Sequence, residues 1–167
     1  MLEIERLSSR YAVRRMREAD ADAILELCLQ NTQYYQYCGK QPSRELILSD
    51  LRALPPRTAA EAKYYVGFYA QGCLAAVMDL IDGYPEAQYA FIGFFMMNRG
   101  MQGRQLGSAL IGEVCAYLAE AGKTAVRLGI DKGNPQSTHF WQKNGFYTLE
   151  EIAMDGGKIL YAERRLK

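Results

Sequence analysis

The 167-residue sequence has little of what marks several common classes of protein. It contains one histidine, His139, and its four cysteines show no C-x-x-C spacing, so we expect free thiols and no metal site. No run of about 18 apolar residues is present, and the N-terminal segment MLEIERLSSR has no apolar signal core. We therefore expect a cytoplasmic protein without a membrane anchor. The net charge of +1 argues against nucleic acid or an anionic membrane as a partner.

Two phosphate-binding signatures are also missing. No Gly-Lys-Ser/Thr follows a glycine loop, and G-x-G-x-x-G is absent, which excludes a P-loop and a dinucleotide fingerprint. What is present is typical of a globular chain, because 49% of the residues are apolar and 23% are charged. The length predicts one domain, residues 1–167, with a core from about 11 to 165.

The stretch Asn98–Gly122 carries the strongest local signal. An apolar run, Ala90–Met97, leads into a loop that is interrupted by glycines, and an amphipathic helix with apolar residues at helical spacing follows. A helix N-terminus presents unpaired N–H groups and the positive end of a dipole, so it favours anions. The order predicts either a phosphate site at the start of this helix or an ordinary strand-to-helix turn.

The rest of the chain predicts a mixed fold. Short helices are expected near 21–29 and from Ser43 to a stop at Pro55–Pro56, and strands at 11–14, 63–69, 73–81, 90–97 and 125–130. A helix begins at Asn134–Pro135, and a hairpin over 146–154 and 158–164 ends the chain. The tyrosine-rich segment 31–40 is expected to be a loop that either lines a pocket or packs on the core. The fold class is therefore α+β, with a mixed, mostly antiparallel central sheet flanked by helices.

Two sequence blocks make the chain resemble the GNAT superfamily of N-acetyltransferases. The coenzyme A loop of that family reads Gln/Arg-x-x-Gly-x-Gly/Ala, and Gln102, Leu106 and Gly107 fit it here. A second block, an asparagine followed by an aromatic helix that ends in Gly-Phe, is matched by Asn134, Phe140, Trp141, Gly145 and Phe146. The resemblance covers most of the chain and implies a GNAT-like fold with acetyl-coenzyme A as co-substrate.

The resemblance also implies where acetyl-coenzyme A binds. Backbone amides across Gly103–Ser108 would hold its pyrophosphate, and the strand that ends at Met96–Met97 would diverge from the strand near Ala125 to make a slot for the pantetheine arm. Asn134 would lie near that arm, cap its helix, or do both. The implied cofactor-binding residues are Met96, Met97, Gln102, Gly103, Arg104, Gln105, Leu106, Gly107, Ser108 and Asn134.

The chain departs from the family pattern at three positions. Gln105 replaces the first motif glycine, and we expect a side chain there to be tolerated if the residue is already helical. Trp141 stands where many members have a tyrosine general acid, and indole cannot donate a proton as a phenol does; we expect it in the core or in the slot wall. Phe91 occupies the usual position of a glutamate base.

Catalysis therefore needs other groups, and the candidates are Asp79 and Glu86. Asp79 lies inside an apolar run, so it is either paired structurally or directed into a cleft. Glu86 lies in a polar loop, where exposure to solvent is the alternative role.

The resulting prediction is an N-acetyltransferase that acts on a primary amine of a small molecule or peptide. The alternatives are a non-catalytic acyl-coenzyme A sensor and, less directly, an unrelated phosphate-binding protein. The sequence is also compatible with a homodimer.

Overall fold

A computed structural model describes residues 1–167. The elements follow one another along the chain in this order: η1 Ile4–Leu7, β1 Ala12–Arg15, η2 Glu18–Asp20, α1 Ala21–Leu29, α2 Thr32–Cys38, α3 Arg44–Arg52, η3 Ala60–Ala62, β2 Lys63–Ala70, β3 Cys73–Asp82, β4 Tyr89–Met97, η4 Arg99–Met101, α4 Leu106–Glu120, β5 Ala125–Asp131, α5 Pro135–Lys143, β6 Tyr147–Met154 and β7 Gly157–Arg165.

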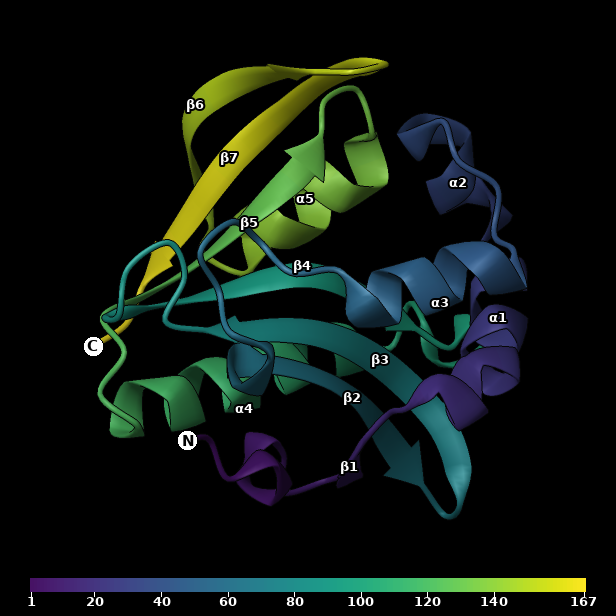
Figure 1. Ribbon diagram of the computed structural model, residues 1–167, viewed down its shortest axis with the longest axis horizontal. Helices are drawn as coiled ribbons and strands as arrows, with labels where there is room; N and C mark the ends of the chain where they lie inside the picture. The colour runs from purple at the N-terminus through teal and green to yellow at the C-terminus, as the bar shows by residue number, and fades with distance from the viewer.

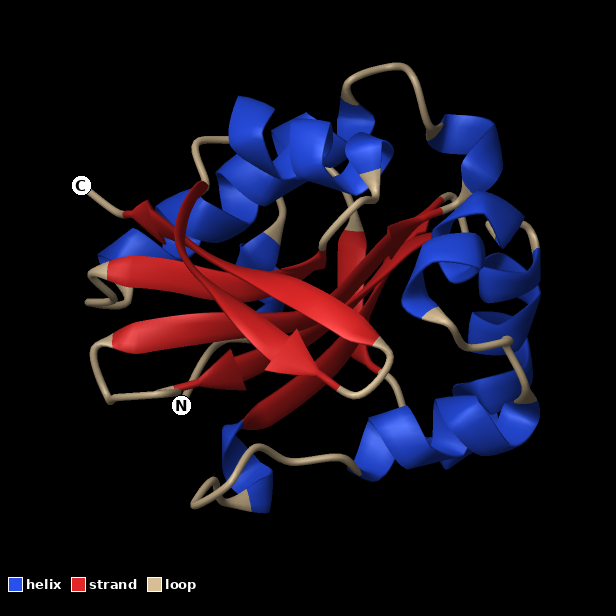
Figure 2. Cartoon of the chain, turned by 90° about the horizontal axis from the view of Figure 1, so that it is seen from above, coloured by secondary structure: helices blue, strands red, loops and turns tan.

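One seven-stranded sheet holds these elements together, in the order β1-β2-β3-β4-β5-β7-β6. Every neighbouring pair is antiparallel except β4 and β5, which are parallel. Parallel neighbours need a crossover, and α4 supplies it. Helices cover the sheet on both faces (Figures 1 and 2). The expected α+β class, with a mostly antiparallel sheet, is confirmed.

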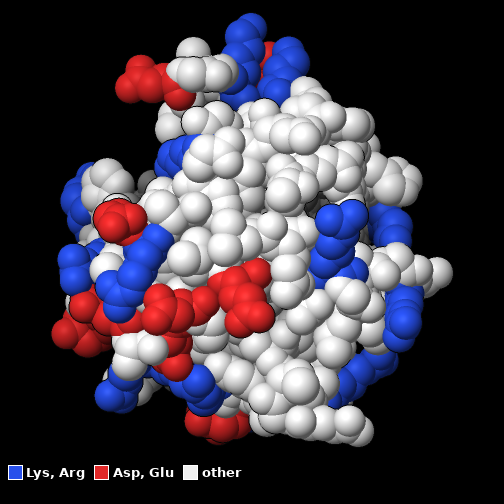
Figure 3. Space-filling model, turned by 90° about the vertical axis from the view of Figure 1, so that its right-hand side faces the viewer, with Lys and Arg blue, Asp and Glu red and all other residues white.

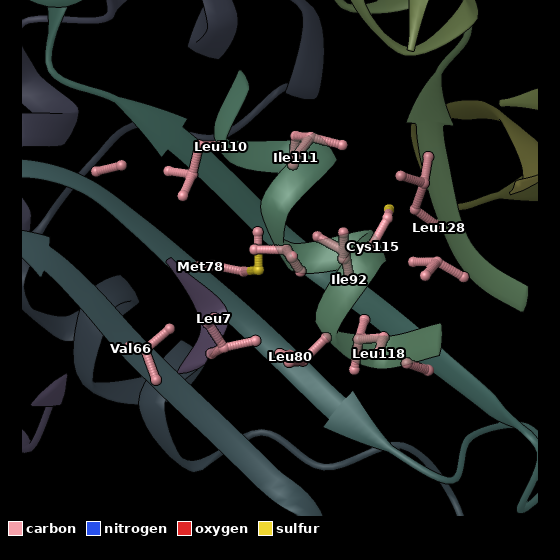
Figure 4. Packing of buried hydrophobic residues seen from close by; sticks show 14 of the residues in the cluster. Leu7, Val66, Met78, Leu80, Ile92, Leu110, Ile111, Cys115, Leu118 and Leu128 are labelled. Carbon is pink, nitrogen blue, oxygen red and sulfur yellow. The ribbon is translucent and has the colours of Figure 1, made fainter. Parts of the chain in front are cut away.

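The two faces of the sheet have separate apolar cores. On one face α4, α5 and η1 pack against the central strands, and Figure 4 shows Leu110, Ile111 and Leu118 of α4 among buried residues of the strands. On the other face a smaller cluster joins α1, α2 and α3 to β2, β3 and β4. We call these the α4 face and the α1–α3 face. Neighbouring residues of β4 alternate between them, so Phe95 packs on the α4 face and Phe94 on the α1–α3 face.

Capping signals place the helix ends where the sequence predicted them. The Ser43 hydroxyl accepts a hydrogen bond from the Leu46 amide at the start of α3, at 3.1 Å. Asn134 caps α5 in the same way through Ser137, with Pro135 at the first helical position. Gly122 follows the end of α4 with a φ of 86°, in the left-handed region that glycine adopts freely.

One local expectation was wrong, and a condition placed on another residue is not met. The segment 31–40 contains a helix, α2, which begins after Asn31 and ends at Gly39 in the left-handed conformation. The tyrosines hold it in place, because Tyr35 is buried and the ring of Tyr34 packs edge-on against Phe94. Gln105 is not helical: its φ of 58° and ψ of 12° are left-handed, and α4 begins only at Leu106.

At the edge of the sheet, β6 is exposed along its whole length, including the apolar side chains of Leu149, Ile152 and Met154.

No helix in the structure combines the length and the apolar character needed to cross a bilayer.

Candidate active site

The site begins where β4 and β5 stop pairing. Their parallel register runs from Tyr89 opposite Ala125 to Ile92 opposite Leu128, and no pair follows it. Beyond that point β4 continues to Met97 and β5 to Asp131. In Figure 1 the two strands lie together at the left and diverge toward the right, where α2 lies. The predicted divergence of these strands is confirmed.

A β-bulge lies at the point of divergence. Asp79 of β3 pairs with Phe94 and Leu80 pairs with Ile92, which leaves Gly93 of β4 as the extra residue. On β5 the first residue past the last pair is Gly129. Two glycines therefore flank the gap where it opens, and both line the cavity described next. A Cβ at either position would meet a neighbouring side chain, Asp79 at 2.9 Å for Gly93 and Ile159 at 2.8 Å for Gly129, so close packing requires glycine at both.

The gap is continuous with a cavity of about 480 Å³. This volume is in the range of small-molecule binding sites. Phe95, Phe140 and Trp141 line it from the α4 face, whereas Tyr34 and Phe94 line it from the α1–α3 face. The cavity thus reaches both faces of the sheet through the gap.

One end of the cavity is formed by the N-terminus of α4. Gly103, Gln105, Gly107 and Ser108 line it there. At Gly103, with a φ of 77°, a Cβ would meet nothing within 4 Å, so the space beside this turn is open. Gly107 is different, because a Cβ would lie 3.3 Å from the Phe140 ring and 3.4 Å from the Met97 side chain.

Positive charge is concentrated on the lining of this cavity. Arg99 and Lys143 are its two cationic residues, and the unpaired N–H groups of the α4 N-terminus add a partial positive charge. Figure 3 looks at the side toward which β4 and β5 diverge: its right-hand part shows basic side chains and no acidic ones, whereas acidic side chains gather at the lower left. The α4 end of the cavity can therefore hold an anion.

A polar network, buried at Asn31 and partly exposed at Gln102, ties the loop before α4 to the end of β4. The Asn31 amide donates to the carbonyl of Leu27 at 2.9 Å and to that of Met97 at 3.3 Å. Gln102 donates to Asn31 Oδ1 at 2.5 Å and to the Met97 carbonyl at 3.1 Å. The Gln102 side chain thus fixes its own loop. Sequence reasoning missed Asn31, and the only signal for it was its position just after a predicted helix.

The comparisons with known proteins agree with this arrangement. The model of the acetyltransferase (GNAT) family matches residues 27–146, a span that includes the gap, the α4 N-terminus and α5. The chain belongs to the GNAT acetyltransferase family. It is accordingly an acyltransferase. A search for similar sequences among curated proteins finds no match.

Several solved acetyltransferases share the GNAT fold of this chain. An acetyltransferase from Thermus thermophilus is 20% identical, with a TM-score of 0.72 over 92% of this chain and 96% of that one. The PaiA N-acetyltransferase from Thermoplasma acidophilum, in complex with coenzyme A, is 18% identical, with a TM-score of 0.64 over 92% and 97%. The aminoglycoside acetyltransferase AAC(6')-Ib, in complex with coenzyme A and kanamycin, is 16% identical, with a TM-score of 0.69 over 92% and 93%.

Most of the residues that the GNAT resemblance implied lie on the cavity. Met97, Gln102, Gly103, Gln105, Gly107, Ser108 and Asn134 line it, whereas Met96, Arg104 and Leu106 do not. Asn134 is buried, and its Oδ1 caps α5, while its Nδ2 has no protein partner. The capping role is therefore present, and the amide nitrogen stays available to a ligand.

Trp141 occupies both places expected of it in this GNAT chain. It is buried in the core of the α4 face and also lines the cavity. Its ring packs edge-on against Phe95, Phe140 and Phe146, with centroids 4.9 to 6.0 Å away. It is held as a wall of the slot.

The two predicted catalytic carboxylates do not line the cavity. Asp79 accepts a hydrogen bond from the buried Lys63 ammonium at 2.7 Å, which is the structural pairing considered above. Its other oxygen, Oδ1, is buried without a partner. Burial raises the pKa of Asp79, although Lys63 acts in the opposite direction. Glu86 lies on an exposed loop, where it accepts a hydrogen bond from Gln88.

Asp79 nevertheless lies next to the gap. A Cβ added to Gly93 would be only 2.9 Å from Asp79 Oδ2, so the carboxylate fills the space that a side chain would take. Gly93 itself lines the cavity, so the carboxylate lies beside a cavity-lining residue.

Asp131 is a second residue that the sequence did not single out. It is the single carboxylate among the residues that line the cavity, and no side-chain hydrogen bond or ion pair holds it. Its only signal in the sequence was its position at the end of a predicted strand, three residues before Asn134.

Proposed function

We propose that this acyltransferase moves the acetyl group of acetyl-coenzyme A to a primary amine of a small molecule or peptide. One observation carries the proposal: the cavity joins the N-terminus of α4, where an anion would be favoured, to a gap lined by Gly93 and Gly129 that reaches the α1–α3 face. A co-substrate with phosphates at one end and a thioester at the other fits this polarity. The relatives that are solved with coenzyme A support this choice.

The residues present fit coenzyme A. Main-chain N–H groups across Gly103–Ser108 would hold the pyrophosphate, helped by Arg99 and Lys143. The edge of β4 from Gly93 to Met97, which β5 no longer pairs, offers backbone groups to the pantetheine arm, and Asn134 Nδ2 offers a donor. Met96 and Leu106 would contribute through the main chain, and Arg104 through its exposed side chain.

Acetyl transfer then requires a neutral amine close to the thioester. The amine nitrogen bonds to the carbonyl carbon, the C–S bond breaks, and sulfur leaves as a thiolate, which takes up a proton. The gap that opens at Gly93 and Gly129 would position the two reactants, and a backbone N–H on the edge of β4 between Gly93 and Met97, which β5 no longer pairs, would stabilise the negative charge that develops on the carbonyl oxygen.

We keep Asp79 as the acceptor of the proton that the amine loses. Its unpartnered oxygen, its raised pKa and its contact with Gly93 support this role, with water carrying the proton past the glycine. No contact supports Glu86 in the same way. Asp79→Asn should lower kcat about tenfold or more and leave coenzyme A affinity unchanged. A folded variant with full activity would show that the Asp79–Lys63 pair is only structural.

The decisive binding test uses two glycines of α4. Gly107→Glu places bulk and negative charge at the cavity, and it should weaken coenzyme A binding more than tenfold, a loss of roughly 1.4 kcal/mol or more. Gly112→Glu puts the same side chain on the same helix at a position where a Cβ meets nothing within 4 Å. Isothermal titration should show wild-type affinity for this control. Equal affinity in both variants, with the fold intact by circular dichroism, would refute the placement.

The alternative function is a non-catalytic acyl-coenzyme A sensor, and Trp141 in place of a phenol is the observation that favours it. Thiol release from acetyl-coenzyme A in the presence of an amine library separates the two functions. Release that depends on an added amine identifies the enzyme. Tight coenzyme A binding without release for any amine would favour the sensor.

A further inference from the structure

The cavity carries its charges at separate places, and one of them is negative. Its two cations, Arg99 and Lys143, come from the segment before α4 and from the end of α5, whereas its one carboxylate, Asp131, is the last residue of β5. The phosphates of a bound nucleotide would be attracted by the two cations and repelled by the carboxylate of Asp131.

Asp131 belongs to the side of the cavity that the amine would enter. Val126, Leu128 and Ile130 face the α4 core, so the alternation of the strand directs Arg127, Gly129 and Asp131 to the α1–α3 face. The phenol of Tyr34 is close by: burial is the main reason that its pKa is raised, and the charge of Asp131 contributes. Tyr34 and Phe94, whose rings pack edge-on, form the aromatic wall there.

The carboxyl group of Asp131 is half-buried and has no hydrogen-bond or ion-pair partner in the protein. Burial raises its pKa, and the positive charge of Lys40, just past α2, acts in the opposite direction without forming an ion pair. Asp79 has Lys63, and Asp82 has Lys123. Asp131 therefore offers an unsatisfied negative charge to whatever occupies this part of the cavity, and an ammonium group satisfies it best.

The position of Asp131 along β5 separates it from the point of reaction. It is two residues beyond Gly129, on the same face, which corresponds to about 6.6 Å along a strand. The amine that attacks must be neutral, so it is not the group that a carboxylate holds as an ammonium. A short alkyl chain with an amine at each end would span the two points, with its methylenes against Tyr34 and Phe94.

We propose that Asp131 binds a second, protonated amino group of the acceptor, so that the preferred substrates are aliphatic diamines and larger polyamines. This inference rests on the proposed function, because it takes the gap at Gly93 and Gly129 as the place of transfer. It makes Asp131 a residue that determines specificity. Asp79 keeps the task of accepting the proton.

The test compares two amines that differ only in the second amino group, 1,4-diaminobutane and 1-aminobutane. Equilibrium binding of each is measured by calorimetry, with and without saturating coenzyme A, so the result does not depend on turnover. The wild-type protein should bind the diamine roughly tenfold or more tightly than the monoamine, since a hydrogen-bonded charge pair shielded from water contributes on that scale. Asp131→Asn should remove this preference, and Asp131→Glu should keep part of it.

Glu150→Gln is the matched control, because Glu150 is exposed on β6 and takes part in no ion pair. It should keep the full preference for the diamine. Steady-state assays should show the Asp131→Asn effect in KM for the diamine rather than in kcat or in coenzyme A affinity. Equal wild-type binding of the two amines, or an unchanged preference in Asp131→Asn, would overturn the inference. Failure to bind coenzyme A would instead count against the proposed function.

Discussion

Gln105 holds a left-handed backbone conformation that costs a residue with a side chain about 1–2 kcal/mol. Had Gln105 been helical, the condition on which the sequence allowed a side chain here, glycine would have cost stability. Because the structure shows a left-handed residue, glycine should instead stabilise the fold. We expect Gln105→Gly to raise the free energy of unfolding by about 1 kcal/mol, measured by urea denaturation, and to keep or tighten coenzyme A binding.

A matched substitution is available outside the site. Gln71, in the turn between β2 and β3, has a φ of 51°, so Gln71→Gly should also stabilise the fold, with no effect on coenzyme A affinity. A destabilised Gln105→Gly variant would contradict the left-handed assignment.

Lys63 and Asp79 form a buried ion pair whose two members depend on each other. Their side chains are 8% and 14% exposed. Lys63→Met should lower the free energy of unfolding by about 3–5 kcal/mol at pH 7, because it leaves a buried carboxylate without its partner. The double variant Lys63→Met/Asp79→Leu should recover most of that loss. Two additive losses in denaturation experiments would show that the residues do not act as a pair.

The pH dependence of the Lys63→Met variant follows from the raised pKa of Asp79. A carboxyl group whose pKa is higher in the folded than in the unfolded protein binds more protons when folded, so stability falls as pH rises from the unfolded to the folded value. Removal of Lys63 should raise the folded pKa further. The deficit of Lys63→Met relative to wild type should therefore shrink on acidification, and a deficit independent of pH would contradict this cause.

At the scale of the elements, α5 presents its aromatic residues to the slot. Trp141→Tyr keeps an aromatic ring but loses part of the contact with Phe95, Phe140 and Phe146, so we expect a loss of about 1–3 kcal/mol in the free energy of unfolding. Turnover should stay within a few-fold of wild type, since the surroundings of the indole are apolar rings and offer a phenol no proton path. A large gain in turnover would identify the native protein as a weakened enzyme or a sensor.

The elements that the sequence predicted well are those with local signals. Alternation of apolar and polar residues predicts the β2–β3 hairpin. Helical spacing and a glycine stop predict α4, and an N-cap followed by proline predicts α5. The sequence of helix α2, TQYYQYC, shows no helical spacing of apolar residues. The helix is stabilised instead by tertiary contacts of Tyr34 and Tyr35, which no local pattern reveals.

The site was predictable only where its residues lie close together in the sequence. The loop from Gln102 to Ser108 could be placed at a helix N-terminus, and seven of the ten implied residues line the cavity. The pairing of Asp79 with Lys63 joins positions 16 residues apart across two strands, and no local pattern shows it. Asn31 and Asp131 are polar residues at element ends, a position too common to single them out.

For the whole molecule, several expectations stay predictions. A single sheet includes strands from Ala12 to Arg165, which supports one domain over residues 1–167 without testing it. The cytoplasmic location also stays a prediction. Homodimer formation is open, and sedimentation equilibrium would decide it.

The early end of the β4–β5 pairing divides the sheet mechanically. Strands β1 to β4 form one part and β5 to β7 another, and four paired residues on each strand, Tyr89–Ile92 and Ala125–Leu128, are the ladder between them. This seam is shorter than the β3–β4 and β5–β7 ladders on either side of it. We expect the backbone amides of β4 beyond Ile92 that point toward the gap, unlike those that pair with β3, to exchange rapidly with deuterium in the free protein and to become protected when coenzyme A bridges the parts. Unchanged exchange on binding would mean that the ligand does not join them.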